Sequence, residues 1–211
     1  MTQREIIIER ASSMFVTQGV KAVRMDDIAQ ELSISKRTLY ELFGDKEELL
    51  YQSILHFLVK GQQRRVENSQ SVENSLEVML ICLRDMIVYA PISGRIRANL
   101  KRFYPKVFER LEGDTKANSK EDLRRWVKGC VASGYFTVTA DSDLVVRVLQ
   151  DSVHGIAHMD MFDTMDSVHV VSRIAYALVI FIRGLCTQSG IEVIDRCFDK
   201  YFGNITSIDT L

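Results

Sequence analysis

Along the first part of the chain, apolar side chains recur at the three-to-four-residue spacing of amphipathic helices. The first set shares one helix face and consists of Ile7, Ile8, Ala11, Met14 and Phe15. Gly19 is expected to end this helix as a C-terminal cap. A second short helix is predicted over Asp26–Leu32. A third is predicted over Lys36–Phe43, with Ser35 as its N-cap and Gly44 as its stop.

The same periodicity predicts helices along the rest of the chain. Asp45 followed by Glu48 resembles a capping box, so a fourth helix is expected from about residue 46 to 66. Pro, Gly and small polar residues separate the further helical segments: 72–90, 93–111, 117–133, 141–161, 167–187 and 190–202. The strand-like stretch 135–141 is interpreted as a loop into a helix capped by Asp141. The predicted fold class is all-α.

The opening helices form too small a segment to be stable alone, because residues 1–45 cannot bury enough surface. We therefore expect them to pack on the fourth helix. This gives two domains, residues 1–45 and residues 46–211, with helix 46–66 shared between them.

Two short helices joined by a tight turn, the second polar on its outer face, are typical of a helix-turn-helix. In that motif the second helix enters the major groove of DNA and reaches phosphates and base edges. The side chains placed to donate hydrogen bonds there are Lys36, Arg37, Thr38, Tyr40 and Lys46, and Ser35 at the helix start is also a predicted DNA contact. Lys46 lies at the start of the fourth helix, whose free N–H groups also attract anions. The sequence therefore predicts a DNA-binding surface, although a solvated helix face would explain Lys36 and Arg37 taken alone.

Overall charge does not by itself indicate nucleic acid. The formal net charge is -1, and residues 1–50 contain seven Lys and Arg against nine Asp and Glu. The argument for DNA depends on where the cations lie, and non-specific binding is expected to be modest and sensitive to salt.

The remaining composition argues against several other classes of protein. The four cysteines, Cys82, Cys130, Cys186 and Cys197, form no C-x-x-C pair, which fits reduced thiols in a cytoplasmic protein. The charged start is not a secretory signal, and the apolar run Ile174–Ile182 is shorter than the roughly 20 residues of a membrane span. No Ser-His-Asp set, glycine-rich phosphate loop or paired-acid signature occurs, so we expect neither enzymatic activity nor a cofactor.

The stretch "MDDIAQELSISKRTLYELFGDKEELL" resembles the TetR family of bacterial transcriptional repressors, and so does "IIIERASSMFVTQGV" before it. The resemblance covers residues 4–50 without a gap. Its matching positions are the apolar set of the first helix, Gly19, Asp27–Ala29, Ser35, Thr38–Tyr40, Phe43 and Lys46–Leu49. It implies that the chain begins with a DNA-binding domain.

Three positions depart from the family pattern. Arg24 stands where Ser or Thr is usual, so the second helix lacks its N-cap hydroxyl, and Arg24 either contacts a phosphate or is solvated. Ser33 replaces a turn glycine and must accept a backbone better suited to glycine. Leu42 replaces a common His and removes one phosphate contact. These departures bear on which DNA sequence is read.

The resemblance also implies that residues 46–211 bind a small-molecule effector and dimerise. Candidate effector contacts lie on segments that surround the family's pocket: Met79, Met86, Tyr89, Phe103, Phe108 and Trp126. Core packing explains each of them as well. His154 and His158 have a spacing that can hold a metal, but no third ligand is evident, so we interpret them as structural or pocket residues. The cationic run from Arg95 to Arg110 either neutralises an anionic ligand or is a solvated face.

Residues 167–185 are apolar on nearly every side, so this helix is expected to bury one face in its own core and another against a partner chain. With helix 141–161 it would form a four-helix interface, although burial within one chain is the alternative. The sequence thus predicts a cytoplasmic, homodimeric, ligand-responsive repressor of transcription on a palindromic DNA operator. The alternative is a small-molecule or metal-binding protein with a vestigial DNA-reading surface.

Overall fold

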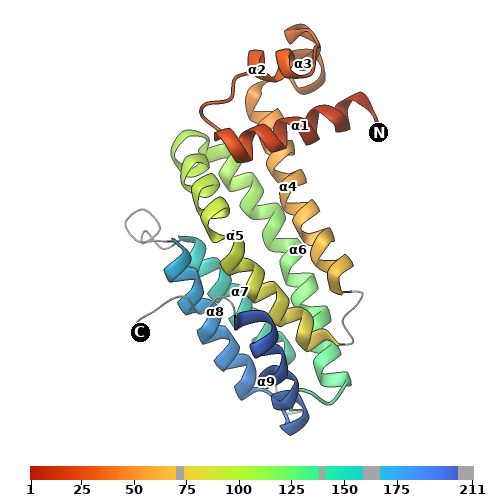
Figure 1. Cartoon of the computed structure of the whole chain (residues 1–211), viewed down its shortest axis with the longest axis vertical. Coiled ribbons are helices and arrows are strands. Elements are labelled where there is room, and N and C mark those ends of the chain that lie inside the picture. The colour runs from red at the N-terminus through yellow and green to blue at the C-terminus, as the bar shows by residue number, and fades with distance from the viewer. Residues whose placement is uncertain (70–73, 138–140, 159–166, 204–211) are drawn as a thin grey trace. The chain divides into compact units, whose positions relative to one another are not determined.

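The computed structural model describes residues 1–69, 74–137, 141–158 and 167–203, most of which are helical (Figure 1). The helices are α1 Gln3–Gln18, α2 Met25–Glu31, α3 Lys36–Phe43, α4 Lys46–Ser69, α5 Ser75–Phe103, α6 Pro105–Ala132, α7 Ser142–His158, α8 Ser167–Gly184 and α9 Gln188–Phe202. Within the described ranges, extended pairing is limited to one antiparallel bridge between Phe136 and Cys186. The predicted all-α fold class is confirmed.

The chain packs as two compact units. The first unit comprises residues 1–64 and 92–115, and the second comprises residues 65–91 and 116–211. Helices α4, α5 and α6 each contribute residues to both units. The division at residue 45 concerns function and stays a prediction. As a packing unit, the N-terminal part extends through most of α4 and includes segments of α5 and α6.

One apolar core holds the first unit together. Its buried side chains from α1 to α4 include Ile7, Phe15, Ile28, Leu39, Leu49 and Leu50. Residues from α5 and α6 join the same core: Ile96, Leu100, Val107 and Leu111. The three short opening helices thus bury their apolar faces against longer ones, as burial of enough surface requires.

The helix ends around α3 follow the sequence signals. Ser35 Oγ accepts a hydrogen bond from the Thr38 backbone N–H at 3.0 Å, which confirms the N-cap of α3. Gly44 ends α3 with φ +77°, the left-handed region that favours glycine. Asp45 Oδ1 accepts from the Glu48 backbone N–H at 2.8 Å, so the expected cap of α4 is present.

The predicted break at Pro91 is wrong, because α5 continues through Pro91 to Phe103. Buried side chains lie on both sides of the proline, with Ala90 in the core of the second unit and Ile96 in that of the first. Burial of side chains on both sides of the proline outweighs the hydrogen bond that a proline removes from a helix interior. The chain instead turns at Tyr104, and Pro105 occupies the first position of α6, where a missing N–H is tolerated.

The predicted break between residues 111 and 117 is also absent, because α6 continues to Ala132. Gly113 lies inside the helix, at a cost of about 1 kcal/mol relative to alanine. Leu111 before it and Val127 after it are both buried, so packing again overrides a local breaker signal.

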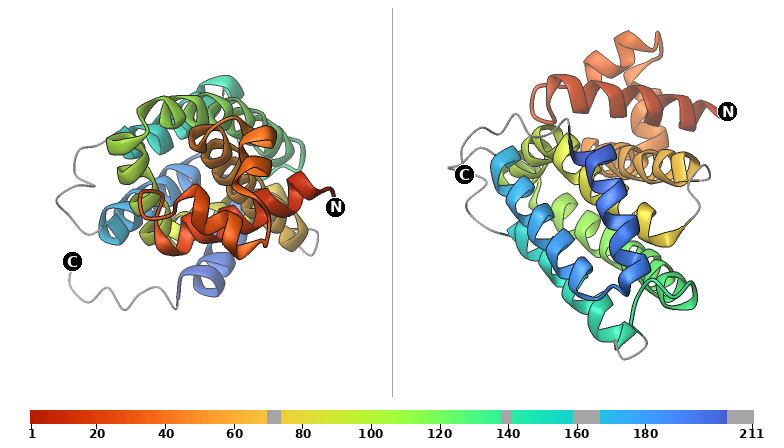
Figure 2. Two further views of the ribbon diagram at one scale, coloured as in Figure 1. Left: turned by 90° about the horizontal axis from the view of Figure 1, so that it is seen from above. Right: turned by 60° about the horizontal axis from the view of Figure 1, so that its bottom comes forward.

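In the second unit, α8 packs against both α7 and α9 (Figures 1 and 2). The apolar core of the second unit includes Leu80 of α5, Val127 of α6, Leu149 of α7, Ile182 of α8 and Phe202 of α9.

The start of α7 also follows its sequence signal. Asp141 Oδ1 accepts from the backbone N–H groups of Asp143 at 3.0 Å and Leu144 at 3.2 Å. The predicted cap of this helix is therefore confirmed.

Among the described residues, no helix is long and apolar enough to cross a membrane. None of the four cysteines forms a disulfide bond. Burial raises the pKa of Cys130 to about 12 and that of Cys186 to about 11. Both thiols are therefore protonated and poorly nucleophilic at neutral pH.

Candidate nucleic-acid interface

Helix α3 is attached by one face and leaves the other in solvent. Leu39 and Phe43 are buried in the core of the first unit. On the outer face, the Arg37 side chain is 86% exposed and Tyr40 is 44% exposed. A short polar helix held firmly by its apolar side has the geometry needed to enter a DNA groove.

The turn between α2 and α3 contains one residue in a conformation suited to glycine. Ser33 has φ +53°, which confirms the expectation drawn from its replacement of a turn glycine. Its N–H donates to the Gln30 carbonyl at 3.1 Å, and the Ile34 N–H donates to the Ala29 carbonyl at 3.0 Å. These bonds fix the path of the chain into α3.

Ser35 and Thr38, both predicted DNA contacts, are bonded to each other. Their hydroxyl oxygens lie 2.8 Å apart, in addition to the capping bond from the Thr38 N–H. Each hydroxyl has one hydrogen, and one of the two is used between them. The pair therefore has one hydroxyl hydrogen left to donate to a phosphate.

The two adjacent cations of α3 each pair with an acid. Lys36 Nζ lies 2.8 Å from Asp26 Oδ1, and Arg37 Nε lies 2.7 Å from Glu41 Oε1. The hydrogen bond and the charge of Asp26 raise the pKa of Lys36. Exposed pairs of this kind are weak, because water screens both charges. A DNA phosphate can therefore take the place of either acid at little cost.

Lys46 is the first residue of α4, as predicted, and it makes contacts within the first unit that the sequence did not reveal. Its Nζ donates to the Val20 carbonyl at 2.9 Å and lies 5.3 Å from the centroid of the Tyr104 ring. The side chain ties α4 to the loop between α1 and α2, and a DNA contact by its ammonium stays a prediction. A DNA contact by the N-terminal N–H groups of α4 also stays a prediction.

Arg24 directly precedes α2, and its side chain is exposed. Its backbone N–H donates to Asp27 Oδ2 at 2.7 Å, and no side chain at this position caps the helix. The predicted absence of a capping hydroxyl is confirmed. A phosphate contact by the guanidinium stays a prediction.

The predicted effector contacts fall in both units. Met79, Met86 and Trp126 belong to the core of the second unit or pack against it, and Tyr89 of the same unit is exposed. Phe103 and Phe108 belong to the first unit, where the cations of Lys21 and Arg97 lie over their rings. The structure thus does not gather all six side chains within one unit.

His154 and His158 lie on α7, but their side chains fall outside the described residues. In the part of the chain that the structure describes, no group of three or more His, Cys, Asp or Glu is arranged to hold a metal ion. The effector site stays a prediction.

Part of the cationic run 95–110 contacts other helices of the first unit, a role that the sequence did not reveal. Arg95 Nη2 donates to the Val16 carbonyl at 2.5 Å, and Arg110 Nη1 donates to Glu48 Oε2 at 2.6 Å. These partners are 79 and 62 residues away along the chain, so no local pattern could identify them.

Comparison with known proteins is consistent with a helix-turn-helix in the N-terminal helices. Residues 7–52 match the family model described as "Bacterial regulatory proteins, tetR family". The HTH-type transcriptional repressor KstR2 of Mycolicibacterium smegmatis is 24% identical over 165 residues, which cover 72% of this chain and 76% of that protein.

Two solved structures share the fold along most of the chain. A TetR-family transcriptional regulator from Pectobacterium atrosepticum is 22% identical, with a TM-score of 0.67 over 88% of this chain and 94% of its own. A TetR-family regulator from Cytophaga hutchinsonii is 16% identical, with a TM-score of 0.67 over 88% and 95%.

Proposed function

Because the chain belongs to the TetR family of bacterial regulatory proteins, and is a DNA-binding transcriptional regulator, we propose that it acts as a homodimeric repressor on a palindromic operator. The observation that carries this proposal is the presentation of α3. Its apolar face is buried, its outer face is polar and exposed, and its N-terminus follows a tight turn. The protein acts in the cytoplasm, where the chromosome lies.

Four side chains of α3 carry the contact with DNA. Lys36 and Arg37 exchange their acidic partners for phosphates or for guanine O6 and N7. Thr38 supplies a hydroxyl at the same helix start, and Tyr40 reaches a backbone phosphate. Arg24 at the start of α2 adds a further phosphate contact. Phosphate contacts orient α3, and base contacts select the sequence.

The dimer forms through α7 and α8. Leu144 of α7 is 57% exposed and Ile180 of α8 is 73% exposed, although both are large and apolar. A twofold axis beside these helices makes the same patch meet itself, as in most homodimers. Two copies of α3 then reach successive major grooves, roughly 34 Å apart on a palindrome.

An effector binds the C-terminal part and shifts the affinity for DNA. The proposed coupling is a tilt of α4, which contributes residues to both units. The effector changes DNA affinity only as far as it binds the two conformations differently, and couplings of about 1–3 kcal/mol are typical.

The direct test removes the cations of α3 and compares the result with an equal loss of charge elsewhere. We expect the double variant Lys36→Ala/Arg37→Ala to lose at least a hundredfold in affinity for the duplex that the wild type prefers. The matched control is Lys120→Ala/Arg125→Ala on α6, whose two cations are also exposed and whose Arg125 also pairs with a nearby acid, Asp122. Equal losses in the two variants would contradict the proposed role of α3. Fluorescence anisotropy at fixed salt measures both.

A further inference from the structure

Arg4, in the first turn of α1, contacts the C-terminal end of α3. Its Nη1 donates to the Leu42 carbonyl at 2.7 Å, and its guanidinium carbon lies 4.7 Å from the centroid of the Phe43 ring. Its Nη2 donates to Gln52 Oε1 of α4 at 3.0 Å. A cation at the C-terminal end of a helix also meets the negative end of the helix dipole. One planar group thus joins α1, the last turn of α3 and α4.

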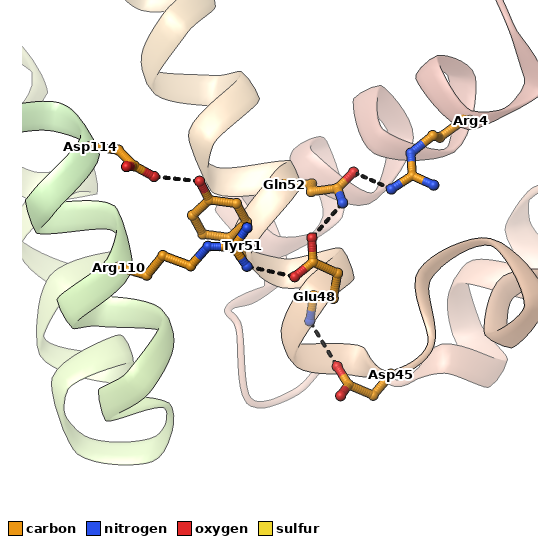
Figure 3. Close-up of polar contacts among 7 residues, drawn as sticks. All are labelled: Arg4, Asp45, Glu48, Tyr51, Gln52, Arg110 and Asp114. Atoms are coloured by element: carbon orange, nitrogen blue, oxygen red, sulfur yellow. Dashed lines mark hydrogen bonds and ion pairs between the residues drawn. The ribbon is translucent and has the colours of Figure 1, made fainter. Parts of the chain in front are cut away.

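Hydrogen bonds continue from Gln52 toward α6 (Figure 3). Gln52 Nε2 donates to Glu48 Oε1 at 2.6 Å, and Arg110 Nη1 donates to Glu48 Oε2 at 2.6 Å. Every donor in this series faces an acceptor: the amide oxygen of Gln52 faces Arg4 and its nitrogen faces the carboxylate. The polar chain, as we call Arg110–Glu48–Gln52–Arg4, therefore leads from α6 to the end of α3.

Further contacts hold the Arg110 end and the centre of the polar chain in place. The Arg110 guanidinium lies 3.4 Å from the centroid of the Tyr51 ring, and the Tyr51 hydroxyl donates to Asp114 of α6 (Figure 3). At the centre, burial acts to raise the pKa of Glu48, but the hydrogen bonds from Gln52 and Arg110 outweigh it and lower the pKa overall. Glu48 is therefore ionised at neutral pH and holds both donors with charge-assisted bonds.

We propose that Arg4 is a positioning residue for the DNA-reading helix α3, and that the polar chain from Arg110 through Glu48 and Gln52 holds it in place. The inference rests on the proposed function, because it assigns α3 the role of reading DNA. Loss of the chain loosens the last turn of α3 while leaving its cations in place. Discrimination between DNA sequences therefore falls more than affinity for random DNA does.

The first test is a double-mutant cycle on the full-length protein, measured as the ratio of affinities for the preferred and a random duplex. Arg4→Gln and Arg110→Gln are each expected to lower this ratio at least fivefold. No hydrogen bond or ion pair joins the two residues directly, so independent effects would multiply to within about twofold. Because both act through one chain, the double variant is expected to lose little more than either single variant. A loss equal to the product would overturn the proposal.

The matched control is Arg10→Gln, which removes the same charge from the same helix. Arg10 pairs with Glu31 of α2 and lies outside the polar chain. We expect it to leave the affinity ratio within about twofold of the wild type, the scatter of independent sites. The salt dependence gives a second readout for Arg4→Gln. If the slope of log affinity against log salt concentration is the same as in the wild type, Arg4 has a positioning role. A slope lower by about 0.9 would show that Arg4 itself contacts a phosphate, and would overturn the proposal.

The second test uses no DNA, so that it separates this inference from the proposed function. Hydrogen exchange of residues 36–44 is expected to rise in Arg4→Gln and in Arg110→Gln, but not in Arg10→Gln. Gln52→Leu cuts the chain in the middle without changing charge, and serves if an arginine variant does not fold. Unchanged hydrogen exchange in Arg110→Gln and Gln52→Leu would overturn the proposed role of the polar chain in holding α3. If exchange responds and the wild type prefers no duplex, the proposed function fails and the positioning of α3 stands.

Discussion

Two glycines of the first unit differ in backbone conformation: one has a positive φ and the other is helical. Gly44 follows α3 with φ +77°, a left-handed conformation that costs an L-residue roughly 1–2 kcal/mol. Gly113 lies within α6, where glycine is less stable than alanine by about 0.5–1 kcal/mol. At both positions an added Cβ would meet no atom within 4 Å. Backbone conformation, and not space, therefore separates the two.

We predict opposite effects of alanine at these two sites. Gly44→Ala should lower the free energy of unfolding by roughly 1–2 kcal/mol, and Gly113→Ala should raise it by about 0.5–1 kcal/mol. Urea denaturation followed by circular dichroism measures both, with each variant serving as the control for the other. A neutral Gly44→Ala would contradict the left-handed end of α3.

At the residue scale, local signals were readable and distant partners were not. The cap at Ser35, the stop at Gly44 and the strained turn at Ser33 were all predicted, because each depends on residues within a few positions. The contacts of Arg4 and Lys46 could not be read from the sequence, because their partners Leu42 and Val20 are 38 and 26 residues away. Such contacts depend on how helices pack, which a single sequence does not encode locally.

Among the elements, α5 and α6 depart most from their sequence signals. Both continue through residues that usually end or weaken a helix, Pro91 and Gly113. Each has buried apolar side chains on either side of that residue. Burial of side chains worth about 1.5–3 kcal/mol each, on both sides of the residue, exceeds the loss of one backbone hydrogen bond. The sequence predicts two breaks because local propensity does not register this burial.

The two prolines of the chain provide a test of this account. Pro91→Ala restores an N–H inside α5 and removes a ring from its interior, so we predict a gain of roughly 1–3 kcal/mol in the free energy of unfolding. Pro105→Ala, at the first position of α6, should change it by less than about 0.5 kcal/mol. A Pro91→Ala variant no more stable than wild type would mean that the proline is not a cost within this helix. Chemical denaturation of the full-length variants decides the matter.

At the scale of the whole molecule, the all-α class and the family of the first 50 residues were within reach of the sequence. The packing of residues 92–115 with the N-terminal helices was not, because it joins segments far apart along the chain. This packing brings Arg110 of α6 to Glu48 of α4. A change in the course of α6 is thus linked through Glu48 and Gln52 to the end of α3.

The exposed apolar side chains of α7 and α8 lead to a prediction about assembly. Ile180→Asp should convert the dimer to a monomer, because an aspartate there would be buried without a partner in the interface. Val59→Asp, at an exposed position of α4, is the control and should leave the dimer intact. Sedimentation velocity at micromolar concentration measures both. A dimeric Ile180→Asp protein would place the interface elsewhere.

The central claim is that α3 reads a specific DNA sequence in a dimer. In vitro selection from random duplexes, followed by the stoichiometry of binding to the enriched sequence, tests it most directly. The account predicts a palindromic sequence with half-sites about one helical turn apart, bound by two protomers. It also predicts affinity that falls by roughly 0.9 log units per log unit of salt for each phosphate contacted. Selection that enriches no sequence, or a site that binds one protomer, would contradict the account.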